Sequence, residues 1–77
     1  MPTDADVLAG ARRVCRDDAR GVRVIDVIGT NGKKMVNISF PKPVGMSDTT
    51  WQAIIEDVRA KLLGVPGVDR VGLDLTS

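Results

Sequence analysis

The residue with the most distinctive chemistry in this 77-residue sequence is its single cysteine, Cys15. A thiolate is the protein ligand that holds iron–sulfur clusters and many other soft metal centres. One cysteine cannot form an internal disulfide or a multi-thiolate site within one chain. Cys15 could therefore carry a metal or a cluster only in an oligomer that brings several copies together. The alternative is a small buried side chain, because Cys15 falls on the apolar side of a predicted helix.

Histidine is absent from the sequence. Its absence removes the usual general base near neutral pH and the commonest metal ligand in proteins. No pair of a nucleophile and a base can be assembled around one thiol, so we expect that the protein is not an enzyme. We also expect no cofactor, with an iron–sulfur cluster or another metal at Cys15 as the alternative.

Arginine is concentrated near the N-terminus. Five arginines lie within twelve residues: Arg12, Arg13, Arg16, Arg20 and Arg23. The formal net charge of the whole chain is only +1, so no global field attracts nucleic acid or a membrane surface. We predict that Arg12 and Arg16 contact an acidic surface of a protein partner, although the region could also meet phosphates or be a solvated helix face. A nucleic-acid-binding module that uses this helix is an alternative, although the only aromatic residues, Phe40 and Trp51, are too few to stack on several bases.

The segment 41–48 is a third candidate site. Two prolines stiffen it, and it leads directly into a predicted helix. Its apolar side chains Val44 and Met46, together with Trp51 at the start of that helix, are predicted to contact a protein client or partner. Trp51 could equally be a core residue or a half-exposed anchor at an interface, because its large apolar ring suits both positions.

The elements that must position these residues begin with a helix. Thr3 or Asp4 can cap it, and Thr3 and Asp6 have the spacing of a capping box. Apolar residues recur on one face as far as Cys15, and the helix is predicted to fray over residues 17–21. A β-branched strand over residues 22–28 follows. Its odd and even positions are both mostly apolar, which indicates a strand covered partly on both sides.

Asn31-Gly32 is typical of a hairpin turn, because both residues tolerate positive φ angles. The returning strand, 34–40, should direct Val36, Ile38 and Phe40 inward. Ser47 or Asp48 can cap the second helix, and Gly64 is expected to end it in a left-handed conformation. The apolar stripe of that helix and the inward positions of the last strand are Trp51, Ile54, Ile55, Val58, Leu62, Val71, Leu73 and Leu75.

These elements predict one domain over residues 1–77 with an α/β (α+β) fold. We expect a two-layer sandwich of order α-β-β-α-β, with a three-stranded mixed sheet and two helices on one face. The other face, which carries Met35, Asn37 and Ile25 or its neighbours, is then a candidate contact surface. So small a domain buries little surface, so homo-oligomerisation is a possible source of stability. The sequence lacks a signal peptide and a long apolar run, which favours a cytoplasmic protein without membrane contact.

From about Val7 to Leu75 the chain resembles the iron–sulfur cluster assembly domain superfamily, which includes SufT/PaaD-like proteins and the C-terminal domain of NifU. Residues 7–14 are similar to the family's opening helix, and residues 21–27 to its first strand. Residues 56–71 are similar to its second helix and to the Pro-Gly-Val turn before its last strand. The resemblance implies the same α-β-β-α-β fold and a role in metal–sulfur maturation.

The chain departs from the family where the chemistry should be. SufT/PaaD-like proteins carry a Ser-Pro-Gly-Cys-Pro-like loop before the second helix, and NifU carries Cys-x-x-Cys there, whereas residues 43–48 contain no cysteine. The family's acidic Asp-Pro-Glu motif is replaced by Arg16-Asp17-Asp18. We therefore expect a small non-enzymatic accessory or adaptor protein that acts through protein contacts. A metal or cluster carrier that uses Cys15 in an oligomer is the alternative.

Overall fold

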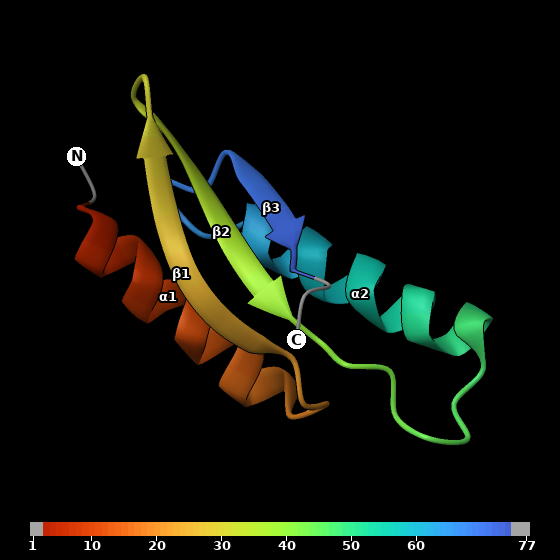
Figure 1. The fold of residues 1–77 in the computed structure, drawn as a ribbon. Coiled ribbons are helices and arrows are strands. Elements are labelled where there is room, and N and C mark those ends of the chain that lie inside the picture. The colour runs from red at the N-terminus through yellow and green to blue at the C-terminus, as the bar shows by residue number, and fades with distance from the viewer. Residues whose placement is uncertain (1–2, 75–77) are drawn as a thin grey trace.

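The computed structural model describes residues 3–74 and contains two helices and one three-stranded sheet (Figure 1). The predicted element order α-β-β-α-β is confirmed. Strands β1 and β2 form an antiparallel hairpin, and β3 lies parallel to β2 on its other side. Both helices cover the same face of the sheet. The elements are α1 (Asp4–Asp18), β1 (Arg23–Thr30), β2 (Lys33–Ser39), α2 (Asp48–Leu63) and β3 (Arg70–Leu73).

Helix α1 begins with the predicted capping box. The backbone N–H of Asp6 donates to the Thr3 hydroxyl, and the backbone N–H of Thr3 donates to the Asp6 carboxylate, both at 3.1 Å. The helix ends within the span 17–21 where fraying was predicted, but fraying at Asp17 and Asp18 is wrong, because the helix stays regular through Asp18. It stops at Ala19, which is in the left-handed region with φ 59°. Contacts of the Asp18 carboxylate with α2, described below, hold this last turn.

Strand β1 contains a β-bulge that the sequence did not predict. Val24 pairs with Ile38 and Asp26 pairs with Asn37, so Ile25 is an extra residue without a partner on β2. The bulge shifts the alternation by one residue, and Val24 and Val27 both face the helices although they are three residues apart. The apolar residues at both odd and even positions of β1 are therefore explained by this one-residue shift in alternation. The prediction of a strand covered on both sides is wrong, because no described element covers the outer face.

The β1–β2 hairpin turn and the turn between α2 and β3 both use residues with positive φ. Asn31 and Gly32 have φ angles of 52° and 78°, as predicted for the hairpin. Gly64 was expected to be left-handed, but its φ is −80°, and its backbone N–H donates to the Lys61 carbonyl at 3.1 Å in a tightened last turn. The positive φ, 92°, occurs at Gly67, in a turn that the Val68 N–H closes on the Val65 carbonyl at 3.1 Å.

The core lies between the sheet and the helices. Val36, Ile38 and Phe40 of the second strand and the residue after it are buried as predicted. Trp51 and Ile54 on the α2 stripe are only partly buried, while the rest of that stripe is buried. Leu75, predicted as an inward position of the last strand, lies outside the described residues. The buried residues are Val7, Ala11, Cys15, Val22, Val36, Ile38, Phe40, Ile55, Val58 and Leu62.

Candidate functional site

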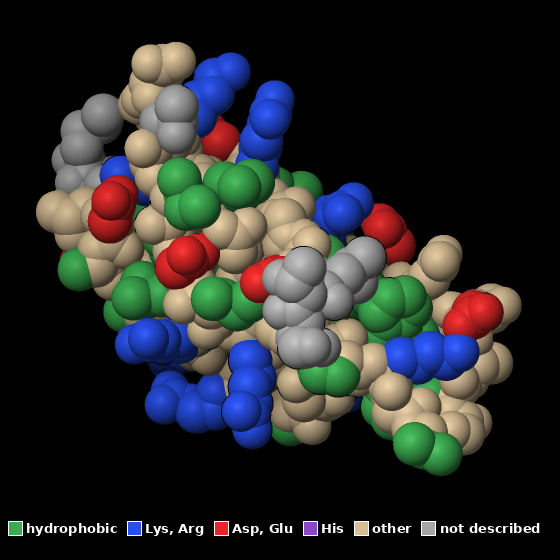
Figure 2. Space-filling view, viewed as in Figure 1, with side chains coloured by type: hydrophobic (Ala, Val, Ile, Leu, Met, Phe, Trp, Pro, Cys, Tyr) green, Lys and Arg blue, Asp and Glu red, His purple; other side chains and the backbone are tan. Residues whose placement is uncertain are grey.

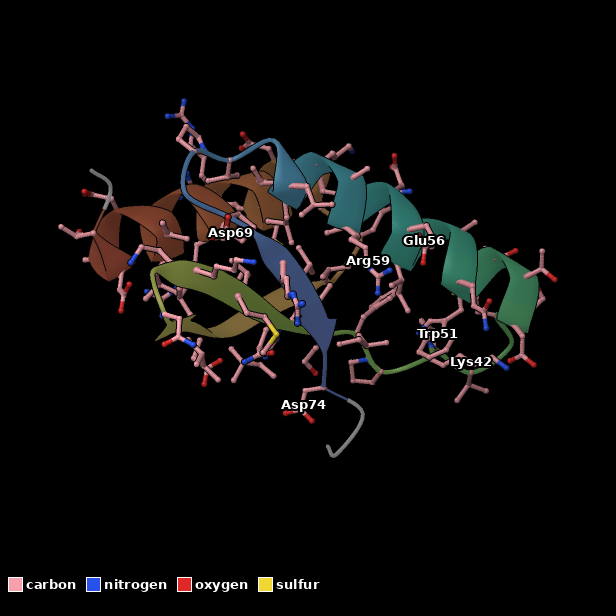
Figure 3. The ribbon with its side chains drawn as sticks, turned by 90° about the horizontal axis from the view of Figure 1, so that it is seen from above. Lys42, Trp51, Glu56, Arg59, Asp69 and Asp74 are labelled. Carbon is pink, nitrogen blue, oxygen red and sulfur yellow. The ribbon has the colours of Figure 1, made fainter. Side chains whose placement is uncertain are left out.

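The connection between β2 and α2 was predicted as a contact surface, and the structure divides its apolar residues into two kinds. The indole Nε1–H of Trp51 donates to the Phe40 carbonyl at 2.9 Å, and Met46 packs partly against the core. These two side chains fasten the connection to the sandwich. Val44 is fully exposed and is an apolar side chain that this segment presents to solvent. Trp51 lies beside Lys42, which pairs with Asp48 at the start of α2 (Figure 3).

Arg12 and Arg16, also predicted partner-binding residues, lie one turn apart on α1 and line a hollow between α1 and the start of β1. The hollow has a volume of about 440 Å³. Arg23 lines it from β1, so three arginines border the hollow. Figure 2 shows Lys and Arg side chains gathered at the lower left of the view, with no Asp or Glu among them. The hollow includes neither Met46 nor Trp51, so the structure separates the predicted partner-binding residues into two surfaces.

The three arginines of this hollow, Arg12, Arg16 and Arg23, have no carboxylate partner within 4.0 Å among residues 3–74. Arg20 belongs to the same run in sequence, yet it is bound elsewhere. The distinction matters because unpaired guanidinium groups that share a surface repel one another, and an anion placed between them relieves this repulsion. The planar fork of arginine also fits a carboxylate or a phosphate with two hydrogen bonds.

Arg20 is held by a cluster of charges that joins the end of α1 to α2. Its guanidinium donates to both oxygens of Asp18, at 2.6 and 2.9 Å, and it also binds Asp57 on α2. Lys61 Nζ donates to Asp18 at 2.8 Å. The hydrogen bond from Arg20, aided by that from Lys61, holds the pKa of Asp18 well below its usual range, although burial acts in the opposite direction. The same bonds raise the pKa of Arg20 and of Lys61.

Cys15, the predicted metal ligand, lies at the floor of the arginine hollow and is 5% exposed. Burial, and to a lesser degree the nearby Asp18 carboxylate, raises the pKa of its thiol. A protonated, buried thiol is a poor metal ligand and a poor nucleophile. The part of the chain that the structure describes contains no group of three or more Cys, Asp or Glu residues suited to a metal ion. The geometry therefore favours the interpretation of Cys15 as a small buried side chain.

The outer face of the sheet is the third surface, here called the open sheet face. Ile25 and Ile28 are 43% and 44% exposed on it, and Met35 lies between β1 and β3. Its position agrees with the predicted contact surface of Met35, Asn37 and Ile25. The Asn37 amide donates to Asp26 at 2.7 Å, which joins two polar side chains at the centre of the face.

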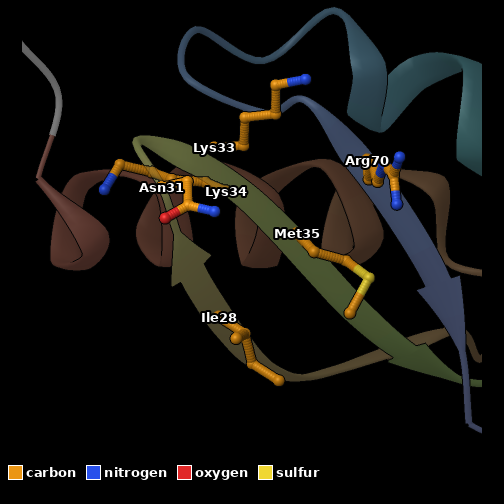
Figure 4. Close-up of a pocket in the computed structure, with 6 residues that line it drawn as sticks. All are labelled: Ile28, Asn31, Lys33, Lys34, Met35 and Arg70. Carbon is orange, nitrogen blue, oxygen red and sulfur yellow. The ribbon is translucent and has the colours of Figure 1, made fainter.

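A groove of about 480 Å³ crosses the hairpin end of the open sheet face (Figure 4). Ile28 and Met35 form its apolar part, and Lys33 and Arg70 contribute positive charge that no carboxylate among residues 3–74 neutralises. Lys34 also lines the groove but pairs with Asp4 of α1. The open sheet face thus carries the hydrogen-bonded pair Asn37–Asp26 with exposed apolar side chains beside it, and it is cationic at the hairpin end.

Sequence reasoning included Arg23 in the arginine-rich region but did not place it beside Arg12 and Arg16. It did not assign Ile28, Lys33 or Arg70 to the groove. Outward positions of β2 and β3 follow from strand alternation, so Lys33 and Arg70 could have been placed beside Met35 from the parallel pairing. Arg23 could not be placed in this way. Its approach to Arg12 and Arg16 depends on how α1 packs on β1, which residues 19–22 determine.

No protein-family model, no curated protein sequence and no solved structure matches the chain. The surfaces described above are therefore the basis for any statement about function. Neither α1 nor α2, the helices of the described part of the chain, is long and apolar enough to span a bilayer.

Proposed function

We propose that this protein is a small, non-enzymatic, cytoplasmic accessory protein of the metal–sulfur maturation type that acts by binding another protein. The observation that carries the proposal is the arginine hollow, which Arg12, Arg16 and Arg23 border without a carboxylate partner in the described part of the chain. The partner is a protein that presents an acidic segment to this hollow.

The resemblance to iron–sulfur cluster assembly domains supports the assignment to metal–sulfur maturation. The α-β-β-α-β order agrees with the fold that the resemblance implies. The connection before α2 lacks the cysteine of the family's loop, and the thiol of Cys15 is buried. These features favour an adaptor that brings other proteins together over a carrier of the cluster itself.

A protein partner is favoured over nucleic acid because of the side chains around the hollow. No aromatic residue lines it, so bases would find no stacking platform there. The hollow is floored instead by aliphatic side chains such as Val22 and Val24. Ile25, the residue after Val24, is exposed on the open sheet face. Cationic groups beside exposed aliphatic groups suit an acidic protein segment with some apolar side chains.

A titration of isotope-labelled protein with a synthetic peptide of glutamate and leucine tests this proposal. We expect amide NMR shifts to concentrate around the arginine hollow. Arg16→Glu should weaken binding about tenfold, because it replaces an attractive contact with a repulsive one. Arg13→Glu is the matched control. It makes the same change of charge on the same helix, but Arg13 does not line the hollow. Equal losses in the two variants would show that only the overall charge matters, and would contradict the proposed site.

Two further ligands separate the alternatives. Inorganic phosphate that binds as tightly as the peptide would indicate a site for small anions and would argue against an adaptor. A single-stranded RNA oligonucleotide that binds more tightly than the peptide, with affinity that falls steeply as salt increases, would favour the nucleic-acid-binding alternative.

A further inference from the structure

We propose that β3 pairs with the β3 strand of a second copy of this chain, antiparallel and centred on Gly72, so that the two sheets form one six-stranded sheet. Strand β3 lies at the side of the sheet, between Asp69 at its start and Asp74 at its end (Figure 3). Among the described residues, only β2 pairs with it.

The backbone of β3 has hydrogen-bonding groups available for this pairing. The N–H of Asp74 donates to the Ile38 carbonyl of β2 at 2.8 Å, and with the pairing of Ile38 and Leu73 this bond sets the phase of the ladder. The N–H of Asp69 also donates to β2, at the Lys34 carbonyl, but Asp69 precedes the strand. Because successive residues of a strand direct their peptide groups to alternate sides, Gly72 also faces β2, while the N–H and C=O groups of Val71 and Leu73 point away from it. These four groups lie on the free edge of the sheet.

The two edges of the sheet differ in how well they could accept another strand. On β1, the bulge at Ile25 interrupts the regular spacing, and such bulges are a common way of blocking edge-to-edge pairing. The β2–β3 ladder contains no shift of register, and β3, although only four residues long, carries no proline. Its one charged residue, Arg70, lies opposite Asp74 of the second copy in the proposed pairing. The regular edge is therefore the one open to pairing.

The sequence of β3 favours a copy of itself as the partner. Antiparallel pairing about Gly72 places Val71 opposite the partner's Leu73, and Arg70 opposite the partner's Asp74. Val71 and the partner's Leu73 then form two backbone hydrogen bonds with each other. The twofold symmetry repeats these two bonds between Leu73 and the partner's Val71. Gly72 would face its counterpart at a non-hydrogen-bonded position, where the two backbones approach most closely and no side chain intervenes. A parallel arrangement in register would instead place like charges side by side, so the charges select the antiparallel pairing.

This interface is independent of the proposed function. The arginine hollow lies at the β1 side of the sheet, and β3 lies at the opposite side. Dimerisation would therefore leave the hollow accessible in both copies. Loss of dimerisation and loss of peptide binding can be measured separately and have separate meanings.

Sedimentation equilibrium of the full chain, from micromolar to millimolar concentration, tests the proposal. We expect a reversible monomer–dimer equilibrium. Arg70→Asp alone and Asp74→Arg alone should each weaken dimerisation about tenfold, because each variant places like charges opposite one another. An equimolar mixture of the two variants should restore it, because every facing pair again has opposite charges. Arg13→Asp, a charge change on α1, should leave the dimerisation constant unchanged, and circular dichroism checks that each variant is folded.

Amide hydrogen exchange provides a second measurement that locates the interface. The amides of Val71 and Leu73 should become protected as the protein concentration rises, since they donate across the dimer. A protein that remains monomeric at every concentration would overturn the proposal. So would a mixture of charge variants that dimerises no better than either variant alone, or a dimer in which the Val71 and Leu73 amides exchange as fast as in the monomer.

Discussion

The charge cluster between α1 and α2 provides the sharpest prediction about stability. Asp18 is its centre, since its carboxylate accepts two hydrogen bonds from Arg20 and one from Lys61. The Asp18 side chain is only 2% exposed, so water cannot replace these bonds if they are lost. We predict that Asp18→Asn lowers the free energy of unfolding markedly at pH 7, because it removes the negative charge and leaves two cations facing a neutral amide.

The size of this effect follows from the bonds that are lost. Hydrogen bonds to charged groups contribute about 1.5–3 kcal/mol each in buried surroundings. The donor side chains reach solvent, so their bonds are partly screened, and the total should be about 2 kcal/mol. A domain of this length has a stability of about 4–12 kcal/mol, so the loss is a substantial fraction. The melting temperature should fall by about 8–16 °C.

Urea unfolding followed by circular dichroism measures this loss, with Asp17→Asn as the control. Asp17 is an exposed neighbour at the same helix end, and its replacement should be neutral or slightly stabilising. The pKa of Asp18 is lowered by folding, so its contribution is complete above the unfolded pKa of about 3.9 and disappears as the pH falls through the lower folded value. The difference between wild type and Asp18→Asn should therefore shrink below about pH 4. Equal stability of the two variants at pH 7 would refute the reasoning.

Two other predictions concern single side chains. Trp51→Phe removes the donor to the Phe40 carbonyl and should cost about 1 kcal/mol in urea unfolding; an unchanged midpoint would show that the bond does not brace the connection. The thiol of Cys15 should react with an aromatic disulfide reagent more than about tenfold faster in urea than in the native state, because folding buries it. Anaerobic reconstitution with iron and sulfide should give a colourless protein that keeps one free thiol per chain, and a visible charge-transfer band would favour the cluster carrier.

The features that could be predicted from the sequence are those with local causes. The capping box of Thr3 and Asp6 depends on residues within one turn. The hairpin at Asn31 and Gly32 depends on two residues that tolerate positive φ. The inward alternation of Val36 and Ile38 follows from strand periodicity, because Asn37 between them is polar.

The features that could not be predicted depend on contacts between elements. An inserted residue in β1 produces the same sequence pattern as a strand with two apolar faces, and only the pairing with β2 distinguishes them. The last turn of α1 was expected to fray because aspartate and glycine have low helix propensity. Its stabilising partner Lys61 lies 43 residues away, so local sequence could not reveal the contact. Gly64 and Gly67 are both close to the end of α2, and which of them takes a positive φ depends on the turn into β3.

The candidate site was predicted in part for the same reason. Arg12 and Arg16 share a helix face, so their proximity follows from helical periodicity. Arg23 joins them only through packing of α1 on β1, and the pairing of Arg20 with Asp57 requires both helices in place. Local patterns therefore identified the arginine-rich region, whereas the separation of bound arginines from unbound ones required the tertiary structure.

The bulge in β1 also makes the strand tolerant of a change in length. Ile25 has no partner on β2, while Val24 and Asp26 keep theirs on either side of it. Deletion of Ile25 would therefore convert β1 into a regular strand without moving any of its existing pairs. The inward valines would keep their places, and the open sheet face would lose one exposed apolar side chain. In variants of this chain, a one-residue gap at this position could thus alter the outer surface while the core remains intact.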